Sequence, residues 1–557
     1  MLAVPFFGQL VYKHNLVVDL AGLQIAQPVQ PAGCAKLAGK AAAYLRRDAG
    51  RHPCSSWYQN TLHHFAVVQL HGAFNRAIAA HLHIVNAHGV YRKMLAQQVA
   101  QFLRKIAHIL EAARAFLPKP LPNLPCTKRS LPFFFQKSID FFLRKGSYIL
   151  LLLHITKVAN KALEFSIKNA DFCRTMRFIT SDTVYPISSE PLKNKVIVTD
   201  ETGLIHDLVD ESSLDAGKIE RHTGFICPGF VNTHCHLELS FMKGKITGGH
   251  GLHNFIKEVE KLKKPEDGET EQAIKRSDEE MYRNGIVAVG DICNTSATFL
   301  FKETSKIYYH NFIEIYAFDE SRAEAAFEKG LKLQGELKDK KNSSITPHAP
   351  YSASRKLLKL FKEYAQKNNS ILSMHNQETA DEDVFFTEKK GSILERLTYF
   401  GIDTSQWQAP GISSLQYTLP QLPSKNKILL VHNTFTSQED IHFANGYNKN
   451  LYWCFCPNAN LYIECELPNI HSFVDSNCRM TLGTDSYASN SSLSILAELK
   501  TLQQRFPKIQ LSEFLKWATL NGAAFLGIED KFGSLEKNKR PGLNLVSPDL
   551  LTVTKLA

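Results

Sequence analysis

The strongest constraint on the fold is a series of eight short apolar runs that end in His, Asp, Asn or other polar residues. The runs are FICPGFVNTHCH, GIVAVGDICN, KIYYHNFIEIYAF, SSITPHAP, SILSMHNQE, KILLVHNTF, LYWCFCPNAN and RMTLGTDS. Continuous apolar runs of this length are typical of parallel strands that are buried on both faces. Segments with helical spacing separate most of them, at residues 252–264, 323–337, 356–367 and 493–505. We therefore expect an α/β fold, a (β/α)8 TIM barrel whose active site lies at the carboxyl ends of its strands.

The net charge of +11 is distributed unevenly over the 557 residues. Residues 1–175 hold 22 Lys and Arg against 6 Asp and Glu, a net of +16, which leaves −5 for the rest of the chain. This basic part has few patterns of regular structure apart from an amphipathic helix expected at 94–116. Three interpretations stay open: an arm for nucleic acid or acidic lipid, a poorly ordered extension, and upstream sequence read from a start codon placed too early. Nucleic-acid binding is disfavoured because no recognisable binding module is present.

Cysteine usage and apolar segments give an expected compartment. The 11 cysteines are scattered and include no Cys-x-x-Cys pair, which favours a reducing environment over a disulfide framework. The start of the chain lacks the basic and apolar regions of a secretory signal. The most apolar run, at 148–155, is about half as long as a membrane span. We expect a cytoplasmic protein that does not associate with a membrane.

Four side chains at the ends of the apolar runs have the chemistry of metal ligands. His234 and His236 alternate along one strand and therefore face the same side of it. His375 ends another run, and Asp485 ends the last one. Three imidazoles and a carboxylate suit a single divalent cation, with zinc as the first choice and iron as the second. Each residue alone could be a hydrogen-bonded strand end, but packing gives no reason for all four to occur together.

From residue 176 to its end, the chain resembles the amidohydrolase superfamily, in the deaminase/chlorohydrolase branch. The matching motifs are PGFVNTHCHLE (228–238), TPHAPYS (346–352), MHNQE (374–378), VHNT (431–434), CPNANL (456–461) and LGTDS (482–486). The resemblance implies the metal ligands His234, His236, His375 and Asp485, and the catalytic residues Glu378, His432 and Asp485. Some members bridge two metals with a carboxylated lysine. No lysine ends a strand here, so we expect a mononuclear site.

These roles predict a hydrolytic deaminase that releases ammonia from an aminated heteroaromatic ring of an adenosine derivative or a purine. A divalent cation lowers the pKa of water to about 7. Asp485 takes up a proton from this water, Glu378 carries a proton to the ring nitrogen, and His432 polarises the developing tetrahedral centre. The stretch NTHCHLELS is most similar to aminodeoxyfutalosine deaminase and related adenosine-derivative deaminases. Guanine deaminase, S-adenosylhomocysteine deaminase and triazine or chlorohydrolase activities stay open, as does a catalytically silent barrel.

Several polar residues beyond the metal ligands are candidates for contact with a small-molecule substrate. The main candidates are His348, Tyr351, Asn460 and Ser489, followed by Asn458, Asn490, Glu238 and Ser240. A loop-capping role is the alternative for each of them, and it is weakest for His348.

The expected domains follow from the change of pattern along the chain. Alternating apolar residues before residue 224, across a turn at 201–203, indicate antiparallel strands. Together with the tail, they resemble the family's small β domain, which we expect as a β-sandwich of 176–227 and 530–557. The barrel is expected at 228–529, behind the extension 1–175. The tail reads NKRPGLNL where the family has Gly-Lys-x-Ala-Asp-Leu-Val, which leaves the edge of this domain open. A homodimer also stays open.

Overall fold

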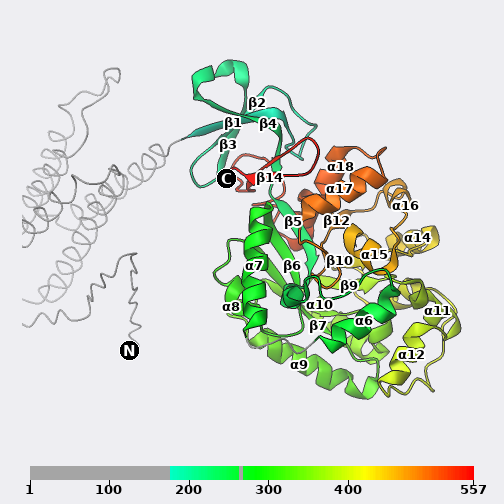
Figure 1. The fold of residues 1–557 in the computed structure, drawn as a ribbon. Helices are drawn as coiled ribbons and strands as arrows, with labels where there is room; N and C mark the ends of the chain where they lie inside the picture. The colour runs from blue at the N-terminus through cyan, green and yellow to red at the C-terminus, as the bar shows by residue number, and fades with distance from the viewer. Residues whose placement is uncertain (1–175, 263–267) are drawn as a thin grey trace, which may run out of the picture. The chain divides into compact units, whose positions relative to one another are not determined.

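The computed structural model describes residues 176–262 and 268–557 (Figure 1). The basic segment 1–175 and its expected helix at 94–116 lie outside the described residues. The three interpretations of that segment therefore stay predictions. The remaining residues form an α/β fold with one mixed sheet and two parallel sheets.

All eight apolar runs contain the strands that the sequence predicted. They form two four-stranded parallel sheets, in the orders β5-β6-β7-β8 and β9-β10-β11-β12. The first sheet contains β5 (Phe230–Cys235), β6 (Ile286–Cys293), β7 (Tyr308–Ile315) and β8 (Ser343–Pro347). The second contains β9 (Leu372–Asn376), β10 (Ile428–His432), β11 (Leu451–Phe455) and β12 (Met480–Leu482). Every residue of β6, β8 and β9 is buried, which explains their lack of apolar–polar alternation.

The outer strands of the two parallel sheets are neighbours on both sides, β5 with β12 and β8 with β9. No continuous hydrogen-bonded ladder joins either pair in the described residues. An isolated parallel bridge joins Cys235 to Asp485, beyond the end of β12. On the other side, the His375 N–H of β9 donates to the carbonyl of His348 at 2.9 Å, just beyond β8. The expected closed barrel is therefore not complete as a hydrogen-bonded ladder in the described part of the chain. The short β12, with three residues, leaves little backbone to pair with β5.

Helices connect the strands, and α7 and α9 flank β6 and β7 in Figure 1. The four predicted helical segments are α6 (Gly251–Lys261), α9 (Ala323–Gly335), α10 (Arg355–Asn368) and α17 (Ile495–Arg505). The others are α7 (Glu269–Arg283), α8 (Phe299–Lys302), α11 (Ala380–Glu388), α12 (Ser392–Tyr399), α13 (Ser414–Thr418), α14 (Gln438–Tyr447), α15 (Pro457–Glu464), α16 (Ile470–Asp475), α18 (Leu511–Ala518) and α19 (Leu520–Leu526). None of the described helices is both long enough and apolar enough to cross a bilayer.

Helix α10 illustrates how the sequence sets these elements. The Ser354 side chain accepts a hydrogen bond from the Leu357 N–H and so caps the first turn. Leu357, Phe361 and Ala365 repeat every four residues and are buried. This stripe packs the helix against the strands, while its charged residues face outward.

The mixed sheet combines strands from both flanks of the parallel sheets. Its order is β14-β13-β4-β1-β2-β3. The strands are β1 (Arg177–Val184), β2 (Lys195–Thr199), β3 (Ile205–Asp210), β4 (Ile219–Pro228), β13 (Leu543–Val546) and β14 (Val553–Lys555). The antiparallel pairing of β2 with β3 across the turn at 201–203 is confirmed. Within the described residues these strands form one sheet and not the two facing sheets of the expected sandwich, because β4 pairs with both β1 and β13.

Candidate metal centre

Three histidine rings converge at the carboxyl ends of β5 and β9. The Nε2 atoms of His234 and His236 lie 3.2 Å apart. A ring nitrogen of His375 joins them, and the three ligand atoms all lie within 4.8 Å of one another. Asp485 Oδ1 lies 3.7 Å from His234 Nε2 and 3.5 Å from His236 Nε2. The structure thus brings together the four side chains that the sequence analysis selected as ligands.

The spacing of these atoms fits a small divalent cation. Zinc binds imidazole nitrogens at about 2.0–2.1 Å, which places two ligands of a tetrahedral site about 3.3 Å apart. The separation of 3.2 Å between the Nε2 atoms of His234 and His236 agrees with this geometry. The Asp485 distances of 3.5 and 3.7 Å are too long for good hydrogen bonds, but they suit two ligands of one ion. Imidazole nitrogen and carboxylate oxygen are also the ligand types that zinc accepts.

Burial keeps the imidazoles of His234 and His375 neutral, which is the state that binds a metal. It lowers the pKa of His234 to about 4 and the pKa of His375 well below its usual value. His375 Nδ1 lies 2.9 Å from the backbone oxygen of His348. Because a carbonyl oxygen only accepts, Nδ1 carries the proton, and the Nε2 lone pair of His375 is available to a metal.

Asp485 reaches the site because the chain turns sharply after β12. Its φ is 56°, in the left-handed region that residues other than glycine rarely adopt. Ser489 Oγ donates to Asp485 Oδ2 at 2.5 Å, so Oδ1 is the oxygen directed at the histidines. Ser489, expected to contact the substrate, is fully buried against this carboxylate. Its contact with a substrate stays a prediction.

His432 lies beside the three histidines and is held by one amide. Its ring stacks on that of His375, with centroids 5.4 Å apart. Asn460 Oδ1 lies 2.9 Å from His432 Nδ1, and Asn460 Nδ2 donates to the His432 carbonyl at 3.3 Å. The amide oxygen only accepts, so His432 Nδ1 carries the proton and Nε2 has a lone pair. Nε2 is buried without a hydrogen-bond partner among the described residues and lies 3.5 Å from Glu378 Oε1.

Glu378 is buried next to this histidine, just beyond β9. Burial raises the pKa of its carboxyl well above the usual range, and the charge of Asp485 adds to this effect. A carboxyl that holds its proton at higher pH is suited to donate that proton to a substrate at neutral pH. The position and the titration of Glu378 therefore agree with the role that the resemblance implies.

Asn460→Ala tests the importance of the orientation of His432. We expect kcat to fall about 10- to 100-fold, the usual cost of removing such an outer partner, because the ring loses the hydrogen bond between its Nδ1 and Asn460 Oδ1. Metal content is expected to match that of the wild type. Asn458→Ala in the same helix is the control, because its side chain contacts Thr501 and not the histidines. A wild-type kcat for Asn460→Ala would remove the positioning role.

His348 and Tyr351 extend the cluster away from the metal ligands. The ring centroids of His348 and His375 lie 4.8 Å apart, and His348 Nδ1 is 2.9 Å from Ser352 Oγ. The Tyr351 ring meets the edge of His348 at 5.9 Å. Burial raises the pKa of Tyr351 well above its usual value, so its hydroxyl stays protonated. Both residues are near enough to the metal ligands for the predicted substrate contacts, which stay predictions.

Four further candidates for substrate contact make hydrogen bonds within the protein: Glu238, Ser240, Asn458 and Asn490. The Glu238 carboxylate accepts hydrogen bonds at 3.1, 3.0 and 2.7 Å from Asn294 and Thr295. Buried Glu498 accepts hydrogen bonds at 2.8 Å from the backbone of Asn458 and the side chain of Asn490. Their hydrogen bonds support the loop-capping alternative.

The sequence analysis missed two buried acids at strand ends. Asp291, in β6, accepts from the Leu237 N–H at 2.8 Å and pairs with Lys302 Nζ at 2.5 Å. Because Leu237 follows His236 directly, this buried pair fixes the turn that presents the histidines. Glu314, in β7, lies 3.6 Å from His375 Nδ1. Both acids occur near the ends of apolar runs, the same signal that selected the candidate metal ligands.

Gly483 allows β12 to approach the histidines closely. A Cβ at this position would lie 2.8 Å from His234 Cβ and 2.9 Å from the Sγ atoms of Cys454 and Cys456. We expect Gly483→Ala to lower the free energy of unfolding by about 1–3 kcal/mol and to weaken metal binding, because His234 must shift. Denaturant unfolding and metal titration measure both effects. Gly446→Ala in α14 is the control, since its Cβ would meet no atom within 4 Å. Equal stability of the two variants would contradict the expectation.

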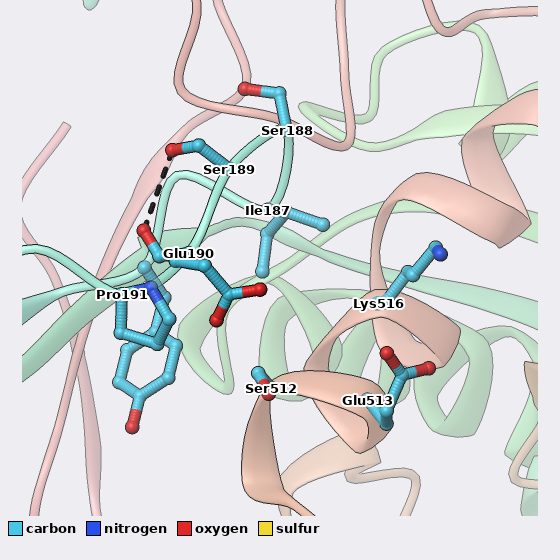
Figure 2. A pocket seen from close by; sticks show the side chains of 9 residues that line it. Ile187, Ser188, Ser189, Glu190, Pro191, Ser512, Glu513 and Lys516 are labelled. Carbon is cyan, nitrogen blue, oxygen red and sulfur yellow. Dashed lines mark hydrogen bonds between the residues drawn. The ribbon is translucent and has the colours of Figure 1, made fainter.

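One cavity lies away from these residues. A space of about 200 Å³ is lined by the segment between β1 and β2, including Ser188 and Glu190, and by Glu513 and Lys516 of α18 (Figure 2). None of the site residues predicted from the sequence lines it. It therefore contributes nothing to the metal centre.

The chain matches the model of a known protein family over more than half of its length. A model of the Amidohydrolase family matches residues 225–556, which include all four ligand candidates. The chain belongs to the amidohydrolase family. The resemblance drawn from the motifs is thereby confirmed.

The similar proteins within the amidohydrolase family include several deaminases. An adenosine deaminase of Helicobacter pylori is 26% identical over 332 residues, covering 58% of this chain and 78% of that protein. A 5-methylthioadenosine/S-adenosylhomocysteine deaminase of Saccharophagus degradans is 25% identical over 383 residues, with 61% and 75% covered. These are distant relatives of the present chain.

Solved structures share the fold. The aminofutalosine deaminase of Helicobacter pylori, in complex with methylthio-coformycin, has a TM-score of 0.56 at 23% identity and covers 67% of this chain and 92% of its own. Atrazine chlorohydrolase of Arthrobacter aurescens, complexed with zinc, has a TM-score of 0.54 at 16% identity, with 68% and 92% covered. At these identities the likeness establishes the fold alone.

Proposed function

We propose that this protein is a mononuclear, zinc-dependent deaminase that hydrolyses the exocyclic amine of an adenosine derivative. The observation that carries the proposal is the convergence of His234, His236, His375 and Asp485 on one point, with Glu378 and His432 beside it. Proteins similar in sequence support the substrate class, because they are adenosine and adenosine-derivative deaminases. We also propose that residues 228–529, with the eight parallel strands, form one domain, and that residues 176–227 and 530–557, with the mixed sheet, form a separate domain.

When bound, the divalent cation supplies positive charge and a water of lowered pKa. Asp485 accepts a proton at Oδ1, while Ser489 holds Oδ2 in place. His432 is neutral because burial lowers its pKa, and its Nε2 lone pair accepts a hydrogen bond from the attacking water and so orients it. This role differs from the polarising role expected from the sequence, which requires a donor at Nε2.

Glu378 moves the protons on the substrate side. Its protonated carboxyl donates to the ring nitrogen next to the reacting carbon as the C–O bond forms. The Glu378 carboxylate then takes up the proton that remains on the added hydroxyl and passes it to the amine, and the C–N bond breaks with release of ammonia. The proton held by Asp485 returns to Glu378 and restores both groups to their starting states. His348 and Tyr351, which extend from His375 away from the metal site, are proposed to contact the purine. Asn460 and Ser489, which lie beside His432 and Asp485, are proposed to contact it as well.

An ammonia-release screen of the full-length, zinc-loaded protein tests this function. The panel contains adenosine, 5′-deoxyadenosine, methylthioadenosine, adenine, guanine, cytosine and melamine, with a chlorotriazine assayed for chloride. We expect an adenosine-type nucleoside to have a kcat/KM at least about 100-fold above those of guanine and the triazines. Faster chloride release from the chlorotriazine would assign the site to chlorohydrolase chemistry. No turnover of any compound by protein with a full complement of metal would favour the silent barrel.

A further inference from the structure

Glu314 has a carboxylate oxygen with no assigned task in the proposed reaction. The residue is 5% exposed and lies in β7, one residue before the strand ends at Ile315. Its Oε2 accepts a hydrogen bond from Asn294 Nδ2 at 3.0 Å. Its Oε1 is buried and makes no hydrogen bond within the described residues. A buried carboxylate oxygen without a donor is costly, so a donor from a bound molecule would stabilise this arrangement.

This oxygen lies beside the metal ligands but does not serve them. Glu314 Oε1 is 3.6 Å from His375 Nδ1, whose proton already goes to the His348 carbonyl at 2.9 Å. Glu314, His348 and His375 form a group whose ligand atoms lie within 4.8 Å of one another. A second cation in this group is disfavoured, because a protonated His375 Nδ1 has no lone pair to offer.

The position of Glu314 relative to the reacting centre indicates which part of a substrate it meets. Its Oε1 lies near the Nδ1 atom of His375, whereas the proposed metal ligand of that ring is Nε2. His348 is the other histidine next to Glu314. Beyond His348, the Tyr316 ring lies 6.2 Å from that imidazole and is 58% exposed. The ring contacts from His375 through His348 to Tyr316 therefore connect a proposed metal ligand with an exposed side chain. Glu314 lies next to His375 and His348 in this series, and we place the part of a nucleoside remote from its amine on the same side.

We propose that Glu314 Oε1 accepts a hydrogen bond from a sugar hydroxyl of the substrate, so that the enzyme selects a ribonucleoside derivative over a free base. The inference rests on the proposed function. In the proposed reaction, the amine and ring nitrogen of an adenosine-type substrate face the metal site and Glu378. The sugar hydroxyls are then the donors that remain for a carboxylate acceptor. Hydrogen bonds to a charged, buried acceptor are among the strong ones, and their loss leaves the acceptor unpaired.

The test measures binding and turnover of adenosine and 2′,3′-dideoxyadenosine by the full-length, zinc-loaded protein. We expect the wild type to favour adenosine roughly 10-fold or more in kcat/KM and in Kd from calorimetry, through the charged hydrogen bond. Glu314→Ala is expected to lose this preference, mainly through a higher KM for adenosine, with little change for the dideoxy compound. Glu314→Gln, which keeps the shape of the side chain, is expected to reduce the preference for adenosine in kcat/KM and in Kd to a value between those of the wild type and Glu314→Ala. The exposed Glu320→Gln is the matched control.

The paired substrates separate substrate contact from a structural role. A general defect in folding or metal binding lowers the values for both compounds equally, and metal analysis of each variant detects it directly. Equal losses for adenosine and dideoxyadenosine would overturn the inference, and so would a wild type that binds both with the same Kd. Absence of ammonia release by the wild type would instead count against the proposed function, while the Kd values would still decide the role of Glu314.

Discussion

Glu378→Gln is expected to lower kcat for ammonia release by about 10³-fold, within the usual range for loss of a general acid–base group. The amide has the same shape, but it cannot carry a proton to the ring nitrogen and on to the leaving amine. Metal content is expected to stay at the wild-type level, since the carboxylate lies near His432 and is not among the proposed ligands. Steady-state kinetics and elemental analysis of the same preparation measure both quantities.

The control for this variant is Glu388→Gln, an exposed carboxylate at the end of α11. It makes the same Glu-to-Gln exchange ten residues further along the chain, at a position exposed to solvent, and is expected to leave kcat unchanged. Turnover of Glu378→Gln within a few-fold of the wild type would sink the assignment of Glu378 as the proton carrier. Loss of metal together with activity would instead indicate that Glu378 supports the metal centre.

His236→Ala is expected to abolish metal binding and to lower kcat by at least about 10³-fold, because the metal contributes several kcal/mol to the transition state. The His236 Nε2 atom lies within 3.5 Å of both His234 and Asp485, so its removal opens one side of the site. Metal content after dialysis and ammonia release are the measurements.

The exposed His250→Ala, just before α6, is the control and is expected to bind metal as the wild type does. Retention of a full equivalent of tightly bound metal by His236→Ala would contradict the assignment of this residue as a ligand. Loss of metal by His250→Ala would show that the segment after β5, and not the ligand itself, controls binding.

The strands and the candidate metal ligands could be selected from the sequence because both selections depend on local pattern. A buried parallel strand has to be continuously apolar, and a polar side chain that interrupts this pattern at its end is conspicuous. Glu314 and Asp291 followed the same rule, but nothing in the sequence shows that Glu314 Oε1 lacks a donor or that Asp291 pairs with Lys302. Those properties depend on which strands are neighbours.

Contacts between distant segments account for the other differences. Asn460, whose predicted contact with the substrate stays a prediction, also holds His432, 28 residues earlier in the chain, through its amide. The run RMTLGTDS was expected to be a full strand, but only three of its residues form β12 before the chain turns into Asp485 at a φ of 56°. The mixed sheet joins β4 to β13, more than 300 residues apart, and this register cannot be read from the alternation of either segment.

The most direct test of a metal-dependent deaminase is a single titration on the full-length protein. Purified protein is stripped with a chelator and reloaded with zinc in steps, and ammonia release from an adenosine-type nucleoside is measured at each step. The account predicts no release from the stripped protein and a linear rise that stops at one zinc per chain. Undiminished ammonia release by the stripped protein would contradict it.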